Sequence, residues 1–393
     1  MGNVYLVDGA RTAFTSFGGS FVNTNAVALG AATAIEAMKR SKVSPEQIDH
    51  VIYGNVIATS GNAAYLARHI GLHAGVPKEV PALTLNRLCG SGMQSIVSAA
   101  QSILLGEGDV ILAGGAENMS QSPFSNFDVR FKEMKSGNLQ FTDMLQATLF
   151  DEYTGTGMGI TAENLAEQYG ISREEQDEFA LLSHQRAANA REKGLFKEEI
   201  VPVKIQTRKE ETIFEVDEHI KADTTIEALS KLKPVFKQGG TVTAGNASGI
   251  NDGAASVIVA SKKAVNENGL SPLARIVSWG IQGVDPSIMG IGPVPAIKQA
   301  LKRADLTLDD MNLIEINEAF AAQYLAVEKE LGLNREITNV NGGAIALGHP
   351  VGASGTRLVL TCAYELKRRG GKYGLASLCI GGGQGIAMVI ERV

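Results

Sequence analysis

The residue of this sequence with the clearest potential for chemistry is Cys89, in the segment TLNRLCGSGMQS, residues 84–95. Apolar residues precede the cysteine, Gly90 and Gly92 follow it, and apolar residues then recur at helical spacing over 93–104. This pattern predicts a strand, a tight turn and a helix, with the thiol on the turn. The free N–H groups and the dipole of a helix N-terminus favour the thiolate, which is the nucleophilic form of cysteine. The alternative is a buried, inert cysteine, which is a common state of free thiols.

Three further turns carry groups that could act together with this thiol. Asn317 lies in NEAF directly after an apolar stretch, His349 lies in the glycine-rich segment 341–355, and Cys379 precedes the glycines at 381–383. A cysteine and a histidine are the minimum set for acyl transfer through a thioester on the protein, because the imidazole can accept the thiol proton. In α/β proteins such turns gather beyond the carboxyl ends of the strands. We therefore expect the four side chains to meet at one site.

An internal repeat relates the two ends of the chain and must position these turns. Residues 37–55 and 300–318 each read as a basic-ended helix, a turn, a short acidic element and a strand, at an offset of 263 residues. The same offset places the Ser-Gly pair at 91–92 on the Ser-Gly pair at 354–355, and both pairs begin an apolar-periodic helix. The sequence therefore predicts a duplicated α/β unit, with mostly parallel sheets between layers of helices.

The repeat also relates the cysteine turn to the histidine turn. At the same offset Cys89 corresponds to Gly352, and His349 corresponds to Asn86. Each half therefore carries a reactive residue where the other half has none. We expect His349 to lie beside the turn of Cys89, across a pseudo-twofold axis.

A long insertion distinguishes the first half from the second. In the second half the glycines at 381–383 lead directly into a last strand, whereas the glycines at 114–115 are far from the matching strand at 256–260. We expect a helix over 172–193 with a capping box at its start, and a β-prone stretch over 201–217. The predicted division is an N-terminal half from residues 1–118 and 250–268, an inserted loop domain over 119–249, and a C-terminal half over 269–393.

Composition limits the class of protein. The chain has 393 residues, of which 44% are hydrophobic and 20% charged, as is typical of a globular protein with two or three domains. The net charge of −6 argues against nucleic acid as a partner. Three cysteines argue for a reducing compartment rather than a disulfide framework. No secretory signal or membrane-spanning apolar run is visible, so we expect a cytoplasmic protein without membrane contact.

Several weaker patterns receive no catalytic role. His69 and His73 have helical spacing but no neighbouring carboxylate to complete a metal site, so we expect no metal. The glycine-rich turns do not fit the dinucleotide-binding pattern. The basic stretch 231–237 is predicted to be a solvated face, with a phosphate contact as the alternative. Cys362 is predicted to lie in the core, and His184, in a charged helix, on the surface.

The segments LNRLCGSGMQS, NASGINDGAA, NEAF, GGAIALGHPVGASG and CIGGGQG resemble those of the thiolases, the acetyl-CoA acyltransferase family, and the resemblance runs from end to end. It implies the thiolase-like fold, an αβαβα arrangement of two α/β halves with an inserted loop domain that binds coenzyme A. It implies reversible condensation of two acetyl-CoA molecules to acetoacetyl-CoA, or thiolysis of short 3-ketoacyl-CoA. It further implies no cofactor beyond the CoA thioester substrates, a role in fatty acid metabolism, and a homodimer or homotetramer.

The resemblance also implies a role for each residue of the site. Cys89 would carry the acyl group as a thioester, and His349 would lower the pKa of Cys89 and help to hold the thioester oxygen of the second substrate. Asn317 would position a water in that oxyanion site. Cys379 would move the proton at the α-carbon. The backbone N–H groups of Cys89 and Gly381 would form a second oxyanion hole.

The substrate contacts that the resemblance implies leave the acyl chain length open. Gly157 stands where acetoacetyl-specific thiolases usually have histidine, so a 3-ketoacyl-CoA thiolase of broader range is the alternative. Two other function classes remain: a ketoacyl synthase, which typically has histidine in place of Cys379, and a non-catalytic acyl-CoA carrier. The partly apolar segment 124–141 could be a subunit contact. The residues expected to contact CoA or the acyl group are Ser248, Lys221, Met158, Gly157, Met289, Ala319 and Phe320.

Overall fold

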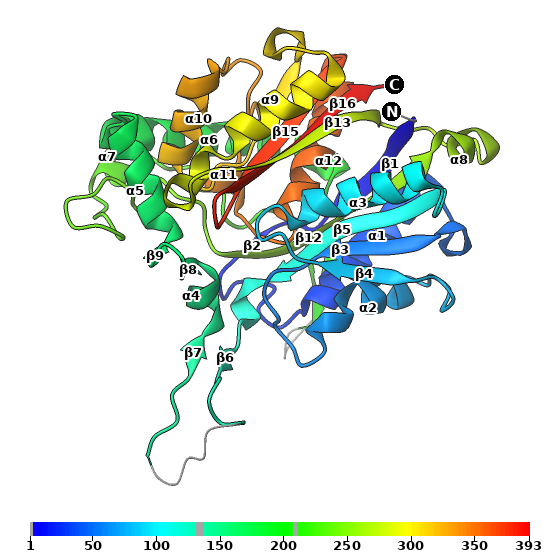
Figure 1. The fold of residues 1–393 in the computed structure, drawn as a ribbon, viewed down its shortest axis with the longest axis horizontal. Coiled ribbons are helices and arrows are strands. Elements are labelled where there is room, and N and C mark those ends of the chain that lie inside the picture. The colour runs from blue at the N-terminus through cyan, green and yellow to red at the C-terminus, as the bar shows by residue number, and fades with distance from the viewer. Residues whose placement is uncertain (1–2, 131–136, 207–210) are drawn as a thin grey trace.

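A ten-stranded mixed sheet forms the centre of the computed structural model, which describes residues 3–130, 137–206 and 211–393 (Figure 1). Among these residues the strand order is β14-β15-β16-β13-β1-β12-β5-β3-β4, with β2 paired to β12. The strands are β1 (Val4–Arg11), β2 (Thr15–Ser16), β3 (His50–Gly54), β4 (Ala82–Leu85), β5 (Val110–Asn118), β12 (Asn251–Ser261), β13 (Ala274–Gly283), β14 (Leu313–Ile316), β15 (Tyr373–Ile380) and β16 (Gln384–Arg392).

Helices cover both halves of this sheet and also separate them. On the outside, α1 (Ala26–Ser41) and α2 (Leu66–His73) pack on the N-terminal strands, and α9 (Pro293–Ala304) packs on β13 and β16 with α10 (Ala321–Leu331) beside it. Between the halves, α3 (Ser91–Leu105) packs on β3 and β5, α12 (Ser354–Arg369) packs on β14 and β15, and the two helices contact each other. The arrangement is the expected αβαβα layering.

The structure carries the repeat that the sequence predicts. The strand order β1-β12-β5-β3 of the first half recurs as β13-β16-β15-β14 in the second. At the offset of 263 residues, α1 and α9 both end at a left-handed residue, Lys42 and Asp305, each with φ of 56°. The short 3-10 helices Pro45–Gln47 and Leu308–Asp310 then follow, each with a capping box. The duplication therefore extends to the helix caps.

The direction of the strands differs from the prediction. We expected mostly parallel sheets, but β14–β15, β3–β5 and β3–β4 are the parallel pairs, while the other neighbours along the sheet are antiparallel. The prediction was wrong because alternation of strands and helices does not tell which strands become neighbours. In addition, β16 follows β15 through a tight glycine turn, and such a short connection makes neighbouring strands antiparallel. A three-residue pairing of β1 with β13 joins the two half-sheets.

Two glycines related by the repeat allow the central helices to touch at their first turns. A Cβ atom at Gly92 would lie 2.7 Å from the backbone nitrogen of Thr356, and one at Gly355 would lie 2.3 Å from that of Met93. Real Cβ contacts are not this short, so any side chain would push α3 and α12 apart. The Ser-Gly pairs that revealed the repeat are therefore the contact point of the two halves.

The insertion contains α4 (Met144–Thr148), α5 (Met158–Gln168), α6 (Arg173–Glu192), α7 (Ile226–Ser230) and the hairpin of β10 (Val203–Gln206) and β11 (Glu211–Phe214). It also contains two short strand pairs, β6 (Phe124–Ser125) with β7 (Thr142–Asp143) and β8 (Phe150–Asp151) with β9 (Thr156–Gly157). The predicted capping box at Ser172 is present. The proposed division into domains remains an interpretation of the sequence.

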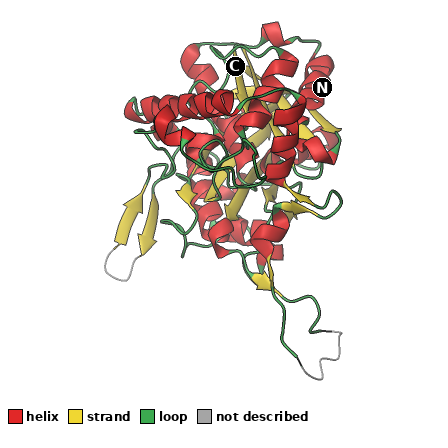
Figure 2. Cartoon of the chain, turned by 90° about the vertical axis from the view of Figure 1, so that its left-hand side faces the viewer, coloured by secondary structure: helices red, strands yellow, loops and turns green. Residues whose placement is uncertain are grey.

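Two parts of the insertion extend from the body of the molecule: the paired strands β10 and β11, and the residues 124–130 and 137–141 (Figure 2). Residues 207–210 of the predicted β-prone stretch and residues 131–136 of the predicted contact segment lie outside the described residues. Large apolar side chains before and after residues 131–136 are exposed, namely Phe124, Phe127, Leu139 and Phe141.

One described segment, Leu88–Leu105, is long and apolar enough by composition to span a bilayer. From the sequence we expected no apolar run of membrane-spanning length. The segment comprises α3 and the turn before it. Many of its apolar side chains, including Met93, Ile96 and Val97, are buried in a large core cluster, whereas Leu104 and Leu105 at its end are exposed. This helix is therefore part of the protein core.

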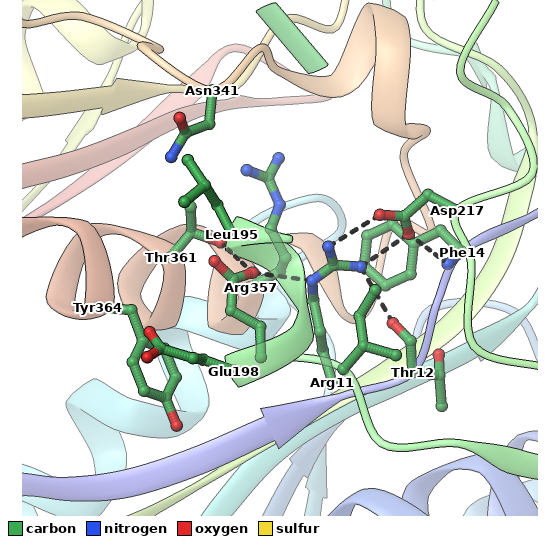
Figure 3. A network of polar contacts seen from close by, with 12 residues as sticks. Arg11, Thr12, Phe14, Leu195, Glu198, Asp217, Asn341, Arg357, Thr361 and Tyr364 are labelled. Carbon is green, nitrogen blue, oxygen red and sulfur yellow. Dashed lines mark hydrogen bonds and ion pairs between the residues drawn. The ribbon is translucent and has the colours of Figure 1, made fainter. Parts of the chain in front are cut away.

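A buried ion cluster holds the insertion on the first strand (Figure 3). The guanidinium of Arg11 donates to both carboxylate oxygens of Asp217, at 2.7 and 2.9 Å, and its Nε donates to Glu199 at 2.9 Å. All three side chains are buried. Thr361 on α12 also donates to Glu199. The cluster thus connects β1, the insertion and a central helix.

We predict that Arg11→Met destabilises the protein by about 3–5 kcal/mol, because the substitution leaves two buried carboxylates without their cation. The measurement is urea unfolding followed by circular dichroism at fixed protein concentration. Lys263→Ala, which breaks the exposed pair of Lys263 with Asp109, is the control and should change the midpoint far less. Equal effects of the two substitutions would contradict the structural role of the cluster.

Candidate active site

Hydrogen bonds from two side chains hold the turn that carries Cys89. Ser91 Oγ accepts from the N–H of Arg87 at 2.8 Å and donates to the carbonyl of Leu88 at 2.6 Å. The N–H of Leu88 donates to Asn86 Oδ1 at 2.8 Å. Leu88 itself is left-handed, with φ of 46°, a conformation that costs a residue with a Cβ atom about 1–2 kcal/mol. These bonds offset that strain and fix the position of the thiol.

The surroundings of the thiol raise its pKa, contrary to the expectation that the helix start lowers it. Cys89 is half-buried, and burial raises the pKa of its thiol. Hydrogen bonds from the N–H groups of Gly381 and of Cys89 itself act in the opposite direction, and the nearby carboxyl of Glu117 raises the pKa further. Burial prevails, so the resting group is a thiol that needs a base. The two N–H groups predicted to form an oxyanion hole are those that favour the thiolate.

His349 is buried between three polar side chains. Its Nδ1 lies 2.6 Å from Ser354 Oγ, its Nε2 lies 3.4 Å from Asn317 Nδ2, and its backbone N–H donates to Asn251 Oδ1 at 2.9 Å. Burial, followed by the charge of Arg357, lowers the pKa of His349 to about 3. The imidazole is therefore neutral. It can accept the proton of the thiol, but it carries no positive charge that would lower the pKa of Cys89.

Cys379 lies at the end of β15 in an apolar cluster with Met289 and Ala319, against which Met158 and Phe320 pack. Burial raises the pKa of its thiol, and Cys89 raises it further. The electrostatic influence of Cys89 on Cys379 shows that the two sulfurs are neighbours. The structure thus brings a second protonated thiol beside the nucleophile, within an apolar cluster.

The predicted substrate-contact residues fall into two groups. The N–H of Ser248 donates to the carbonyl of Ala319 at 2.9 Å, and a Cβ at Gly381 would lie 3.3 Å from Met158 Sδ. Gly157 is open, since a Cβ there would meet only the carbonyl oxygen of Leu149 at 3.6 Å. Lys221, in contrast, is exposed, and its backbone N–H donates to His184 Nδ1 at 3.3 Å.

Sequence reasoning missed two buried carboxylates that connect the turns. Glu117 at the end of β5 accepts from the N–H of Gly352 at 3.0 Å, three residues beyond His349. Glu318, next to Asn317, accepts from Ser183 Oγ at 2.6 Å and from the N–H of Ile345 at 3.2 Å. The signal in the sequence was that each glutamate follows an apolar stretch within a few residues.

The prediction that His184 lies on the surface was wrong, and Cys362 is in the core as predicted. His184 is buried because its face of α6 packs on the segment that carries His219 and Lys221, and its Nδ1 accepts the N–H of Lys221. The many charged residues of α6 hid this face. Most of the basic stretch 231–237 is exposed, as expected. Among the described residues, no group of three histidine, cysteine or acidic side chains could hold a metal ion.

Comparisons with known proteins agree with this fold. Family models for the thiolase N-terminal and C-terminal domains match residues 4–263 and 270–392. The mitochondrial 3-ketoacyl-CoA thiolase of Homo sapiens is 53% identical over 99% of this chain and 98% of its own length. The acetyl-CoA acetyltransferase of Syntrophomonas wolfei is 50% identical over 99% of each chain. The crystal structure of the human mitochondrial thiolase in complex with CoA has a TM-score of 0.96 and 52% identity, covering 100% of this chain and 98% of that one.

We predict that His184 makes stability depend on pH. Burial, then His219, lowers the pKa of His184 to about 4, so between pH 6.5 and 4 the unfolded imidazole binds a proton that the folded one rejects. Stability should therefore fall as the pH falls through this window. The advantage of wild type over His184→Gln should shrink there by up to about 1.4 kcal/mol per pH unit, measured by urea unfolding.

The exposed His73 provides the control for this measurement. The difference between wild type and His73→Gln should stay constant over the same pH range. If the stability difference between wild type and His184→Gln were also constant, protonation of the buried imidazole would not be coupled to folding.

Proposed function

Because this chain belongs to the thiolase family, we propose that its site carries out the thiolase reaction through an acyl-enzyme on Cys89. The family resemblance, the layered α/β fold and the acyltransferase class predicted from the sequence are confirmed. The proposed reaction is condensation of two acetyl-CoA molecules to acetoacetyl-CoA and CoA, or the reverse thiolysis. The observation that carries it is the placement of Cys89, which lies beside a second thiol, Cys379, and packs on the cluster that contains Val351, two residues from the neutral imidazole of His349.

In the acylation step His349 acts as the base. The neutral imidazole accepts the proton of the Cys89 thiol, and the thiolate attacks the thioester carbonyl of the first substrate. Negative charge then develops on the carbonyl oxygen, where the N–H groups of Cys89 and Gly381 can stabilise it. Collapse of this tetrahedral intermediate leaves the acyl group on sulfur. The departing CoA thiolate takes the proton of the neighbouring Cys379 thiol, which leaves a thiolate at Cys379 and the proton of Cys89 on His349.

In the carbon–carbon step Cys379 handles the proton at the α-carbon. During thiolysis its thiol, kept protonated by burial, donates that proton to the departing enolate, and during condensation its thiolate removes it. The enolate oxygen lies against His349 and Asn317 in this proposal. Asn317 Oδ1 is buried without a partner among the described residues, which leaves it available to hold a water.

In this proposal the acyl group lies against the apolar cluster of Met289, Ala319 and Cys379, on which Met158 and Phe320 pack. Ser248 and Lys221 contact the pantetheine and nucleotide parts of CoA in this proposal, as the family resemblance implies. The relative solved with CoA supports CoA thioesters as substrates. The open space at Gly157 favours 3-ketoacyl chains somewhat longer than acetoacetyl.

Assembly and location are further parts of the proposal. The exposed apolar side chains of the 124–141 segment, including Phe127 and Leu139, favour a homodimer or homotetramer in which this segment contacts another subunit. A cytoplasmic location and a role in fatty acid metabolism stay predictions. The human relative is named mitochondrial, which gives the cytoplasmic location no support.

We predict one acetyl group per chain, on Cys89, after incubation with acetyl-CoA and peptide mass spectrometry. Cys89→Ser should remove the label, whereas Cys379→Ser should keep it but slow condensation roughly 10²–10⁴-fold, because only the α-proton transfer is lost. Cys362→Ala, in the core, is the control and should keep both label and turnover. A label on Cys379, or a labelled wild type without CoA-dependent cleavage of acetoacetyl-CoA, would contradict the proposal; the second result would indicate a carrier.

We predict that Gly157 broadens the chain-length range. Two further buried methylenes contribute about 0.8 kcal/mol each, so a C6 substrate should retain a useful fraction of the C4 rate. Gly157→His should fill the space and sharpen the preference for acetoacetyl-CoA, while Gly157→Ala should not, since its Cβ meets only one atom at ordinary contact distance. The measurement is kcat/KM for thiolysis over C4, C6 and C8. Wild-type activity confined to C4 would overturn the idea.

A further inference from the structure

We propose that Ser354 is a positioning residue that fixes the tautomer of His349, so that Nε2 is the nitrogen that accepts the proton of Cys89. This inference rests on the function proposed above and adds to it a residue that does not touch the substrate. Ser354 begins α12, is fully buried, and lies 2.6 Å from His349 Nδ1.

A count of the hydrogens shows which atom donates in this contact. The Ser354 hydroxyl has one hydrogen, and its Oγ lies 2.9 Å from the carbonyl oxygen of Pro350, which can only accept. The hydroxyl hydrogen therefore points to Pro350, and the hydrogen in the 2.6 Å contact belongs to His349 Nδ1. A neutral imidazole has a single N–H, so Nε2 keeps a free lone pair. Asn317 Nδ2, an amide donor, faces that lone pair at 3.4 Å.

The internal repeat explains why this serine is free to accept. Its mate at the offset of 263 residues is Ser91, whose Oγ donates to a carbonyl and accepts the backbone N–H of Arg87. The residue that corresponds to Arg87 in the second half is Pro350, which has no N–H. The acceptor lone pair that serves the backbone in the first half therefore serves the imidazole in the second.

The same nitrogen can then act twice. Nε2 first accepts the proton of Cys89 as a base, and as N–H it donates to the developing oxyanion, while Nδ1–H stays on Ser354 throughout. The ring is held for both tasks, because the backbone N–H of His349 is bound by Asn251 Oδ1. Side chains that fix the tautomer of a catalytic histidine in this way act through the histidine alone.

The test is Ser354→Ala, with Thr356→Val as the matched control. Thr356 is on the same helix turn, is equally buried, and donates to the carbonyl of Gly92 at 2.8 Å, so it controls for the loss of one buried hydroxyl hydrogen bond. Two-bond ¹H–¹⁵N correlation spectra of protein labelled on the histidine rings report the tautomer without any substrate. His349→Asn identifies the signal by its disappearance.

We expect the Nδ1–H tautomer in wild type and in Thr356→Val, and a shift toward Nε2–H in Ser354→Ala. The kcat of Ser354→Ala for thiolysis should fall about 10- to 100-fold with KM changed less than about twofold, short of the roughly 10⁴-fold cost of a fully wrong tautomer in a Ser-His-Asp triad. If Ser354→Ala does not fold, Pro350→Ala decides. It supplies an N–H that competes for Ser354 Oγ and should shift the tautomer the same way.

Three results would overturn the inference: an Nε2–H signal in wild type, an unchanged tautomer in both Ser354→Ala and Pro350→Ala, or equal losses of kcat in Ser354→Ala and Thr356→Val. Failure of the proposed function is seen separately. A wild type that shows the Nδ1–H tautomer but neither acetylates Cys89 nor cleaves 3-ketoacyl-CoA would refute the function and leave the assignment of the tautomer intact.

Discussion

The contact of α3 with α12 at Gly92 and Gly355 is the constraint on which the rest of this structure depends. Each glycine allows the other helix to approach at its first turn, and the turn before each helix carries one half of the chemistry. Any separation of the helices would move the thiol of Cys89 away from the imidazole of His349. The geometry of the site is thus set by backbone contact in the core, and the side chains of the site need no long reach.

A buried charge pair lies behind the residues that do the chemistry. Glu315 and Asn317 share a face of the chain because alternate residues of a strand point the same way. Glu315 lies 3.6 Å from Arg357 of α12, and both are fully buried. Burial raises the pKa of Glu315 to about 8 and lowers that of Arg357, whose charge in turn lowers the pKa of His349. The neutral state of the imidazole is therefore a property of the core beneath it.

Local patterns could be predicted from the sequence, and the features that depend on burial could not. The strand over 313–316, the capping box at Ser172 and the repeat follow from short-range periodicity and cap chemistry, and each is where we expected it. The raised pKa of Cys89 and the buried position of His184 depend on what other segments place around them. The prediction of the strand directions was wrong for a related reason, since alternation of strands and helices does not tell which strands become neighbours. The role of Ser354 needed both the repeat and the distances.

The duplication also explains why the molecule has one site and not two. A symmetric ancestor could have offered a thiol and an imidazole in each half, yet Cys89 corresponds to Gly352 and His349 to Asn86. Each half has kept what the other lacks. The halves are therefore no longer interchangeable, and neither encodes a complete reaction centre. Selection on either half must act through the other, so that the two repeats evolve as one inseparable unit in spite of their common shape.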